Sequence, residues 1–419
     1  MSIDDRLRAA GLPTLPRPVW LEIDLDALAN NVGVIREMVG PHVGISAVVK
    51  ADGYGHGATQ VALAFESAGV ERLCVASLDE ALALRQAGVE ASILVLFPIP
   101  LDGLADAGAA SIQVSASDPA SIRPMIERAR DLPADHLPWV EVEVETGLSR
   151  GGVKVDDVPA VLESLRASRC PVGDLWTHVA APEDVEATAR QVSEFERAIA
   201  LERVAGGGFV PACHMAATGG LFTGRVPAYQ GVRIGLGMYG LLPADLPIPE
   251  ELLLFAARLR PAMSLKCLPL RIERFPAGTR VSYGGRWTAA RESVIATLPA
   301  GYADAIPRPA PWGEALVRGQ RVPLVGTVAM DAVMADVTDV PGVSQDDEFV
   351  LLGSQAGQEI STGDLARART TIPWEVATGM SYRIPRVYHA DSVLMGLRTL
   401  ISETTAAADG ASTKGDRNR

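Results

Sequence analysis

The sequence predicts an α/β protein in which an N-terminal (β/α)8 barrel is followed by a C-terminal, mostly antiparallel β domain. First, β-rich runs alternate with longer helical stretches from about residue 20 to about residue 254. Second, short strands separated by Gly, Pro and Asp turns take over after about Pro261. Third, 419 residues with 48% hydrophobic and 21% charged side chains suffice for two packed domains. We therefore expect an N-terminal extension, a barrel domain, a β domain and a disordered tail over residues 1–18, 19–258, 259–400 and 401–419.

Each barrel strand is expected where a short apolar or alternating run ends before a turn. Helices are expected between them, for example over residues 57–69 and 77–88, where apolar residues recur at three- and four-residue spacing before a glycine. Six or more such units favour a closed barrel, which carries its chemistry at the C-terminal ends of its strands. Lys50, Arg150 and His178 lie at or close to such ends. The expected strands cover residues 43–50, 72–77, 91–97, 111–116, 139–144 and 173–179.

The β domain is expected from short segments in which hydrophobic and polar residues alternate. Residues 333–340 alternate in this way, and a Pro-Gly pair at 341–342 marks the turn that follows. The last residues, 403–419, are small and polar, which predicts a disordered tail. The expected strands lie within residues 264–275, 279–285, 293–300, 313–326, 332–340 and 347–353.

Charge and cysteine content narrow the class of function. A formal net charge of -13 argues against binding along a nucleic-acid backbone, which needs clustered Lys and Arg. No run approaches the ~20 apolar residues of a membrane-spanning helix, and the N-terminal residues lack the apolar core of a secretory signal. The four cysteines show no metal-ligand spacing, which favours reduced thiols in a cytoplasmic protein without a metal site. A small-molecule substrate is the partner that remains.

The segment AVVKADGYGHGA is the strongest candidate for a reactive site. An apolar strand ends at Lys50, and a Gly-rich turn with Tyr54 and His56 follows. A lysine flanked by apolar residues is desolvated, which lowers its pKa and lets its neutral amine attack an aldehyde. Placement alone is also compatible with an exposed lysine before a loop.

Further segments show that the chain resembles the alanine racemase family. KADGYGHG resembles the family's pyridoxal-phosphate lysine motif, and RPVWLEIDLDALANNV resembles the stretch that opens those proteins. The resemblance covers almost the whole chain and implies a pyridoxal-phosphate-dependent isomerase, an amino-acid racemase with alanine as the default substrate, making D-amino acids for cell wall or a secondary product. The further matching segments, in the family's order, are ETGLSRGG, LWTH, GVRIGLGMYG, VSYGG, GYADAIPR, VGTVAMD and RIPR.

The resemblance assigns the two acid–base groups to Lys50 and Tyr283. Lys50 would hold the cofactor as a Schiff base and move the α-proton on one face of the substrate, and Tyr283 would serve the opposite face, because inversion needs both. In the family this tyrosine comes from the partner subunit, so a homodimer with shared active sites is implied. A tyrosine with a pKa of about 10 needs nearby cations to act as a base. His178 and Arg233 are the candidates.

The remaining site residues are implied by the same resemblance. Arg233 would face the pyridine nitrogen, keep its own proton and leave the ring a weaker electron sink, which favours return of the proton. The phosphate would be bound by the Tyr54 hydroxyl and by the backbone N–H groups of Gly235 and Leu236. The residues implied on the substrate side are Arg150 beside the cofactor, Met330 and Asp331 from the partner subunit, and Tyr302 at the entrance.

Three positions depart from the family's pattern. Where the family has a carbamylated lysine that orients the arginine matching Arg150, this chain has Glu143, which we expect to hold Arg150 directly. The family's N-S-A-A at the phosphate is replaced here by HMAA, with His214 and Met215, and a tyrosine that reaches the phosphate is replaced by Trp374. His214 and the Trp374 N–H are expected to compensate in part for the lost hydroxyls. These changes leave room for an amino acid other than alanine.

Glutamates and valines alternate along the strand expected at 139–144. The three carboxylates of Glu141, Glu143 and Glu145 therefore point to one face. The outer face of a barrel strand meets helices, which suits the valines, so the glutamates are expected to line the barrel. Burial of this much charge requires arginine or histidine partners.

Two other functions are compatible with the same architecture. A barrel-type pyridoxal-phosphate decarboxylase shares it, but VSYGG and GVRIGLG favour a racemase. A noncatalytic pyridoxal-phosphate-binding protein would resemble the small barrel proteins that lack a second domain. The presence of both Lys50 and Tyr283 favours catalysis.

Overall fold

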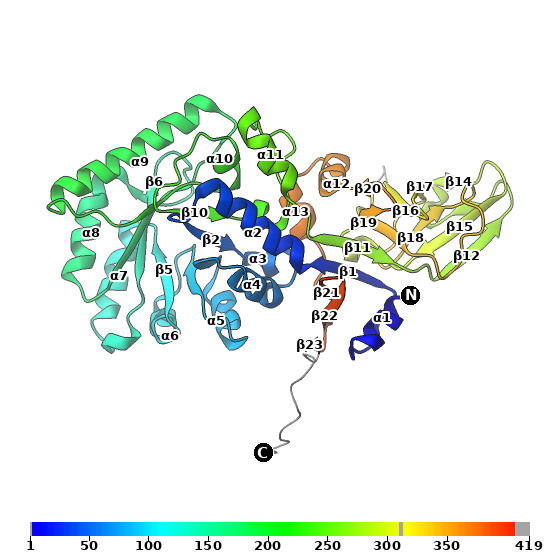
Figure 1. The fold of residues 1–419 in the computed structure, drawn as a ribbon, viewed down its shortest axis with the longest axis horizontal. Helices are drawn as coiled ribbons and strands as arrows, with labels where there is room; N and C mark the ends of the chain where they lie inside the picture. The colour runs from blue at the N-terminus through cyan, green and yellow to red at the C-terminus, as the bar shows by residue number, and fades with distance from the viewer. Residues whose placement is uncertain (1, 310–312, 407–419) are drawn as a thin grey trace, which may run out of the picture. The chain divides into compact units, whose positions relative to one another are not determined.

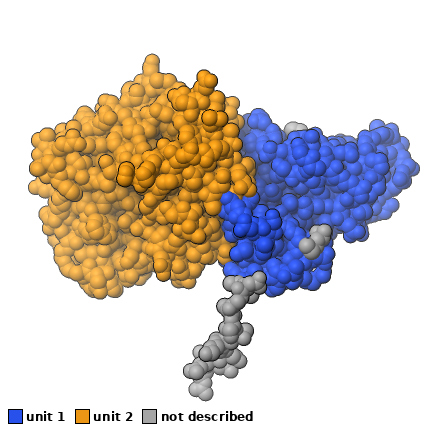
Figure 2. All heavy atoms as spheres, in the orientation of Figure 1, with its two compact units in different colours: residues 1–26, 262–419 blue, residues 27–261 orange. Residues whose placement is uncertain are grey.

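A computed structural model describes residues 2–309 and 313–406 of the chain. The chain forms two compact units, which Figure 2 shows in different colours. Unit 2 is continuous and comprises Ala27–Pro261, whereas unit 1 combines Met1–Asp26 with Ala262–Arg419.

Unit 2 is a closed barrel of parallel strands. Among its described residues, eight strands run in the order β5-β4-β3-β2-β10-β9-β8-β6, and a pairing of β5 with β6 closes the ring (Figure 1). The predicted fold class is therefore confirmed for this half of the chain. The strands are β2 (Gly44–Val48), β3 (Arg72–Val75), β4 (Ser92–Val95), β5 (Ile112–Ala116), β6 (Val140–Glu145), β8 (Val172–Trp176), β9 (Cys213–His214) and β10 (Gly231–Ile234), with β7 (Val153–Lys154) beside β6.

Helices connect successive barrel strands and cover them from outside (Figure 1). The helix α4 (Ala58–Ser67) buries Val61, Ala62 and Phe65, which recur at three- and four-residue spacing, and a glycine follows its C-cap. The others are α2 (Leu25–Val39), α5 (Leu78–Gln86), α6 (Leu104–Ala109), α7 (Pro119–Ala129), α8 (Val158–Ala167), α9 (Val185–Ala205), α10 (Thr218–Phe222) and α11 (Glu250–Arg258), with the short turns α3 (Lys50–Tyr54), η1 (Leu101–Gly103), η2 (Ala134–His136), η3 (Val155–Asp157) and η4 (Leu236–Tyr239).

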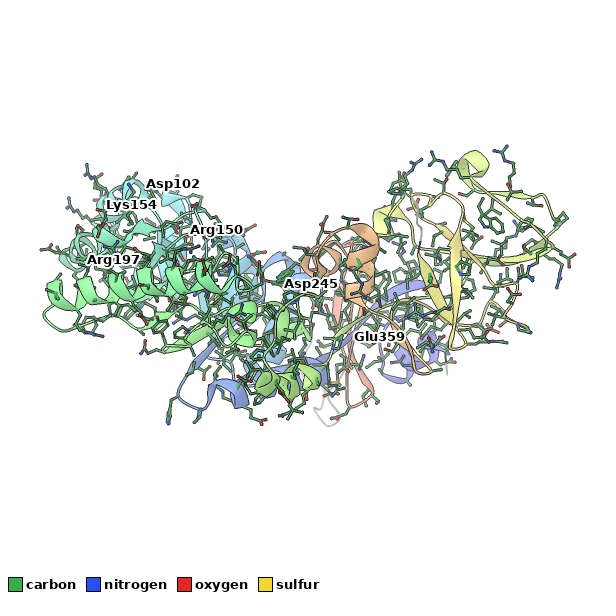
Figure 3. All side chains as sticks on the ribbon, turned by 90° about the horizontal axis from the view of Figure 1, so that it is seen from above. Asp102, Arg150, Lys154, Arg197, Asp245 and Glu359 are labelled. Carbon is green, nitrogen blue, oxygen red and sulfur yellow. The ribbon has the colours of Figure 1, made fainter. Side chains whose placement is uncertain are left out.

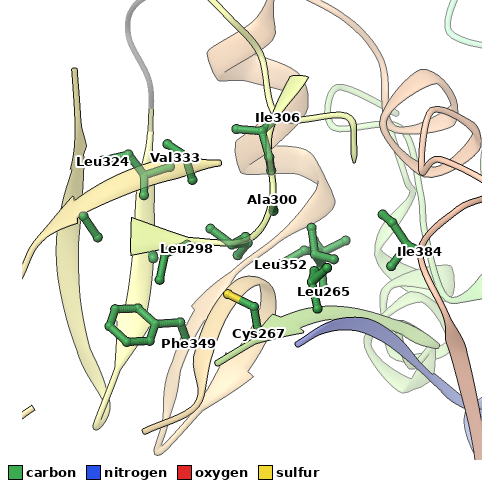
Figure 4. Packing of buried hydrophobic residues seen from close by; sticks show 14 of the residues in the cluster. Leu265, Cys267, Leu298, Ala300, Ile306, Leu324, Val333, Phe349, Leu352 and Ile384 are labelled. Atoms are coloured by element: carbon green, nitrogen blue, oxygen red, sulfur yellow. The ribbon is translucent and has the colours of Figure 1, made fainter. Parts of the chain in front are cut away.

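Unit 1 is built on a twelve-stranded, mostly antiparallel sheet. This confirms the fold class that was predicted for the C-terminal domain. Its core is a large apolar cluster that includes Leu265, Leu298 and Phe349 (Figure 4). The sheet runs in the order β12-β15-β18-β17-β16-β19-β11-β1-β21-β22-β23, with β20 paired to β19. Its strands are β1 (Val19–Asp24), β11 (Met263–Cys267), β12 (Arg271–Phe275), β15 (Ser293–Leu298), β16 (Glu314–Val317), β17 (Gln320–Val325), β18 (Val333–Asp336), β19 (Phe349–Gln355), β20 (Gln358–Ile360), β21 (Arg386–Ala390), β22 (Val393–Arg398) and β23 (Glu403–Thr405).

The smaller elements of unit 1 surround this sheet. A separate hairpin pairs β13 (Arg280–Val281) with β14 (Trp287–Thr288). The helices are α1 (Ile3–Ala9), α12 (Thr362–Arg369) and α13 (Pro373–Thr378), and the 3-10 turns are η5 (Tyr283–Gly285) and η6 (Tyr302–Asp304).

Both ends of the chain lie in unit 1, which differs from the expected domain bounds. Strand β1 pairs antiparallel with β11 and parallel with β21, although residues 19–24 were assigned to the barrel. Its side chains are almost all buried, a pattern that suits either sheet, so the sequence does not reveal which one it joins. Strand β23 lies inside the expected tail and pairs with β22, while residues 407–419 of that tail lie outside the described residues.

Candidate active site

A left-handed turn brings Lys50 to the C-terminal end of the barrel. Within α3, Ala51, Asp52 and Gly53 have φ values of 53, 58 and 61°. Left-handed backbone costs roughly 1–2 kcal/mol for each residue with a side chain. Strain of this kind persists where the surrounding structure enforces it, and it is common at functional sites. The backbone thus marks the segment that the sequence singled out.

Two carboxylates hold this turn in place. Asp52 Oδ1 accepts a hydrogen bond from the backbone N–H of Ala58 at 3.0 Å, at the start of α4. Glu80 of α5 accepts from the backbone N–H of Ala51 at 2.7 Å. The position of Lys50 is therefore fixed by the two helices that follow β2 and β3.

The Lys50 amine lies in a partly desolvated, cationic environment. Burial lowers the pKa of Lys50 below 10.5, and the positive charge of Arg150 lowers it further. The Phe97 ring lies 6.0 Å from Lys50 Nζ and 5.3 Å from Arg150 Cζ, measured to the ring centroid. A larger share of the amine is then neutral at physiological pH, which is the form that attacks an aldehyde.

Tyr54 is buried beneath this turn and depends on Gly235 for space. A Cβ added at Gly235 would lie 2.5 Å from the Tyr54 hydroxyl oxygen. The Tyr54 ring stacks on Tyr239 at 4.9 Å, and burial raises the pKa of Tyr54 to about 12, so its hydroxyl remains a donor. Leu236 follows Gly235 and buries its side chain, which leaves its backbone as the group that can meet a ligand.

Arg233 of β10 is buried inside the barrel and fixed from several sides. Its Nη2 donates to the carbonyl oxygen of Thr177 at 2.6 Å, and its Nη1 donates to His214 Nδ1 at 2.5 Å. Its guanidinium lies 4.6 Å from the centroid of the Trp176 ring. Burial lowers the pKa of Arg233 to about 10, so it stays charged at neutral pH.

His178 follows β8 and carries no charge in this environment. Burial and the positive charges of Arg233, Arg150 and Lys50 lower the pKa of His178 to about 3. Its Nδ1 lies 3.4 Å from Arg233 Nη2, where it is an acceptor. Of the two side chains that were expected to supply positive charge for Tyr283, His178 and Arg233, only Arg233 is charged.

Arg150 is supported by Glu143, as the sequence predicted. Arg150 Nη2 donates to Glu143 Oε1 at 3.2 Å, and Glu143 is 5% exposed. The arginine itself is partly exposed and is labelled in Figure 3. A carboxylate thus stands where the family's pattern has a modified lysine, so Arg150 is oriented without that modification.

The two other glutamates of β6 are also paired. Glu141 accepts from Arg72 Nη1 at 2.6 Å and from His214 Nε2 at 3.0 Å. Glu145 accepts from backbone N–H groups, those of Gly147 and Ser149. The expectation that buried carboxylates need arginine or histidine partners holds for Glu141 and Glu143.

His214 and Met215 are placed differently from what the sequence suggested. Both ring nitrogens of His214 are engaged inside the barrel, by Arg233 and Glu141, so its ring has no donor left for a phosphate. Met215 is fully buried, which leaves its backbone as the contact surface. The sequence shows that His214 departs from the family's pattern. It does not show that the His214 ring is directed toward Arg233 and Glu141 rather than toward a phosphate.

Residues 281–286, 301–305 and 326–331 of unit 1 form one platform of interlocked loops. Backbone N–H groups of Tyr302 and Ala303 donate to the carbonyl oxygens of Ala329 and Met330. The platform presents large exposed side chains, with exposed fractions of 69% for Tyr283, 51% for Met330 and 41% for Tyr302. The structure therefore gathers three sequence-predicted residues on one set of connected loops.

Two further predicted residues belong to unit 1: Asp331, the last residue of the platform, and Trp374, which lies in a different segment. Asp331 makes an ion pair with Arg383 at 2.7 Å. Trp374 lies on α13, partly buried, and its carbonyl oxygen accepts from Thr378.

Several site residues escaped the sequence reasoning. The indole Nε1 of Trp176 is buried and has no protein acceptor among the described residues, so it is a donor available to a ligand. The LWTH segment signalled its histidine but gave no reason to single out the tryptophan. Asp304, Arg383 and Glu80 were also missed, although GYADAIPR and RIPR marked the first two as unexplained motifs.

The chain matches two family models along most of its length. Residues 23–243 match the model described as alanine racemase, N-terminal domain, and residues 262–388 match the model described as alanine racemase, C-terminal domain. The chain is 35% identical over 378 residues to alanine racemase 2 of Caldanaerobacter subterraneus, covering 89% of this chain and 95% of that one. It is 37% identical over 374 residues to an alanine racemase of Mycolicibacterium vanbaalenii, covering 87% and 93%.

A solved structure agrees with both units of the fold. The crystal structure of alanine racemase from Bacillus anthracis with bound L-Ala-P matches with a TM-score of 0.84 and 30% sequence identity. The match covers 93% of this chain and 99% of that one.

Proposed function

Because the chain belongs to the alanine racemase family and is thus an amino-acid racemase, we propose that it interconverts L- and D-alanine with pyridoxal phosphate as cofactor. The observation that carries the proposal is the Lys50 site. A lysine with a lowered pKa follows a strained turn at the C-terminal end of a barrel strand, where barrel enzymes place their chemistry.

The donors around Lys50 fit an anionic cofactor. Arg150 and Arg233 supply positive charge, the Trp176 N–H lacks a protein acceptor, and Gly235 keeps space in front of the Tyr54 hydroxyl. We propose that the phosphate is bound by Tyr54 and by backbone groups around Met215, Gly235 and Leu236, and that the Trp374 N–H also donates to it. When bound, pyridoxal phosphate withdraws electrons from Cα and so acidifies the α-proton.

The proton transfers are assigned to two residues of this chain. In one direction the neutral amine of Lys50 takes the α-proton on one face of the substrate and the phenol of the partner subunit's Tyr283 returns a proton on the other; in the reverse direction the Tyr283 phenolate takes the proton and the Lys50 ammonium returns one. Arg233 stays protonated and donates toward the ring nitrogen, which limits electron withdrawal and favours return of the proton. His178 is neutral and accepts or donates a hydrogen bond without adding charge.

The substrate carboxylate is proposed to bind between Arg150 and the backbone N–H of the partner subunit's Met330, with the partner's Asp331 beside it and Tyr302 at the entrance. Glu143 keeps Arg150 in place for this task. Fixing the carboxylate orients the Cα–H bond toward the two bases, which accounts for much of the rate gain available from positioning.

We propose a homodimer in which each barrel receives Tyr283 and Met330 from the partner subunit. The support is the exposure of these side chains on the rigid platform, where 69% of Tyr283 is accessible. Large exposed aromatic and Met side chains that converge on one surface are typical of interfaces.

The proposed setting is the cytoplasm, where the enzyme makes D-alanine. Within residues 2–309 and 313–406, no helix is long and apolar enough to cross a membrane. All four cysteines are buried and free, which suits a reducing compartment.

The test is α-proton exchange followed by NMR. The protein loaded with pyridoxal phosphate is placed in heavy water with L-alanine and, separately, with D-alanine. Loss of the α-proton signal from both, with appearance of the opposite enantiomer, is expected. Ethylamine in place of the other enantiomer would indicate decarboxylation, and a Lys50→Ala variant provides the inactive control.

A further inference from the structure

A chain of buried and partly buried polar side chains runs inside the barrel from the end away from Lys50 to Arg233. Glu141 and Arg72 are the second and first residues of their strands, and early residues of parallel strands lie toward the N-terminal end of a barrel. Lys50 follows the opposite end of β2. The members of this chain, called here the interior relay, are Arg72 of β3, Glu141 of β6, Asp174 of β8, His214 of β9 and Arg233 of β10.

The interior relay fixes the tautomer of His214. An arginine can only donate, so Arg233 Nη1 at 2.5 Å requires His214 Nδ1 to be the acceptor. The imidazole proton is then on Nε2, which donates to Glu141 Oε2 at 3.0 Å. Burial and the charges of Arg233 and Arg72 lower the pKa of His214, so the ring is neutral.

The same residues do not form a metal site. Ligand atoms of Glu141, Asp174 and His214 lie within 4.8 Å of one another. Arg72 already bridges the two carboxylates, at 2.6 Å from Glu141 and 2.8 Å from Asp174. Its guanidinium supplies the positive charge that a metal ion would bring, and a second cation between Arg72 and Arg233 would be repelled.

We propose that Glu141 is a positioning residue for racemisation: through one tautomer of His214 it holds the Arg233 guanidinium against the cofactor's ring nitrogen. The inference rests on the proposed function, which puts Arg233 at that nitrogen. Without the Glu141 carboxylate, His214 gains access to its other tautomer. An Nδ1–H would then face an Arg233 N–H, and the two donors would push the guanidinium away.

The surroundings of Arg233 make this support necessary. The Thr177 carbonyl and the Trp176 ring restrain one side of the guanidinium, and Trp176 also stacks parallel to His214, with ring centroids 6.3 Å apart and planes 6° apart. The His214 ring is held by its hydrogen bonds to Arg233 and Glu141, so its protonation pattern decides whether it attracts or repels Arg233.

The experiment compares the absorbance of bound pyridoxal phosphate, without substrate, in the wild type and in Glu141→Gln between roughly pH 6 and pH 10. If the Arg233 guanidinium moves away, the cofactor's ring nitrogen takes a proton more readily. The pH midpoint of the absorbance change of bound pyridoxal phosphate should then rise by about one unit. In racemisation assays, kcat should fall roughly tenfold while KM for alanine changes less than about twofold.

Asp174→Asn is the matched control. It removes the other carboxylate from Arg72, but Asp174 Oδ2 lies 3.7 Å from His214 Nε2, beyond hydrogen-bond distance. Neither the absorbance titration nor kcat should change by the amounts expected for Glu141→Gln. An equal change in both variants would mean that loss of buried charge, and not the link to His214, is responsible.

His214→Asn provides an independent route to the same link. Asparagine keeps an acceptor for Arg233 but breaks the connection to Glu141. The double variant Glu141→Gln with His214→Asn should therefore shift the midpoint of the absorbance titration no further than His214→Asn alone. Additive shifts, or wild-type titrations in both single variants, overturn the proposal. If Glu141→Gln does not unfold cooperatively, Glu141→Asp and His214→Asn decide. A wild type that captures pyridoxal phosphate but racemises no amino acid contradicts the proposed function alone.

Discussion

At the scale of single residues, the site is a set of charges that tune one another. Arg150 lowers the pKa of Lys50, and Glu143 holds Arg150. The acid–base role proposed for Lys50 therefore depends on Arg150, which is also proposed to bind substrate. Removing the Arg150 side chain should therefore change the pKa of Lys50, which can be measured without substrate.

Replacing Arg150 by glutamine should shift capture of pyridoxal phosphate by Lys50 to higher pH. Loss of the positive charge stabilises the ammonium form, which raises the pKa of Lys50, so more base is needed to obtain the neutral amine. We expect a shift on the order of half a pH unit in the midpoint of the capture rate, followed by absorbance. Arg197→Gln, on the outer helix α9, makes the same change in net charge and should leave the midpoint in place.

At the scale of elements, the platform of unit 1 depends on one buried carboxylate. Asp304 is 0% exposed and accepts hydrogen bonds from both Arg17 and Arg383, each through two nitrogens. It also accepts from the backbone N–H of Gly301 at 3.1 Å. Because Arg383 reaches Asp331 as well, this carboxylate connects the loops that present the predicted substrate-side residues.

Asp304→Asn should destabilise unit 1 by about 2–4 kcal/mol, because two arginines lose their carboxylate. Urea unfolding followed by circular dichroism measures the change. Glu292→Gln removes a carboxylate from an exposed pair with Arg274 in the same unit and should cost less than about 1 kcal/mol. Equal losses for the two variants would show that Asp304 does not organise the platform.

Sequence reasoning predicted elements well where a long periodic run defined them. The strands β2 to β5 fall within the predicted runs, β6 extends one residue beyond its run, and Glu143 was predicted to hold Arg150. Strand β9 has two residues, too few for a periodic signal, and β1 joins a sheet completed by residues far along the chain. The direction of His214 was missed because its partners, Glu141 and Arg233, come from other strands and meet it after the barrel closes.

At the scale of the whole molecule, a shared active site predicts complementation between inactive variants. Lys50→Ala and Tyr283→Phe are each expected to be inactive as homodimers. Subunits mixed under conditions that allow exchange should form hybrids in which one barrel has both bases. Recovery of about a quarter of wild-type activity is expected for random mixing in a twofold dimer. Mixtures that remain inactive, although native mass spectrometry shows hybrids, would contradict the shared site.

The ion pairs inside the barrel also bear on how the chain finds its strand alignment. The repeating VEVEVE sequence of β6 tolerates a two-residue slip as far as its valines are concerned. One such slip would carry Trp139 to the place of Glu141 and leave Arg72 and His214 without their carboxylate. Unpaired charge in the interior costs several kcal/mol. The ion pairs of Glu141 therefore disfavour a barrel in which β6 has slipped by two residues, although that barrel would bury nearly the same hydrophobic side chains.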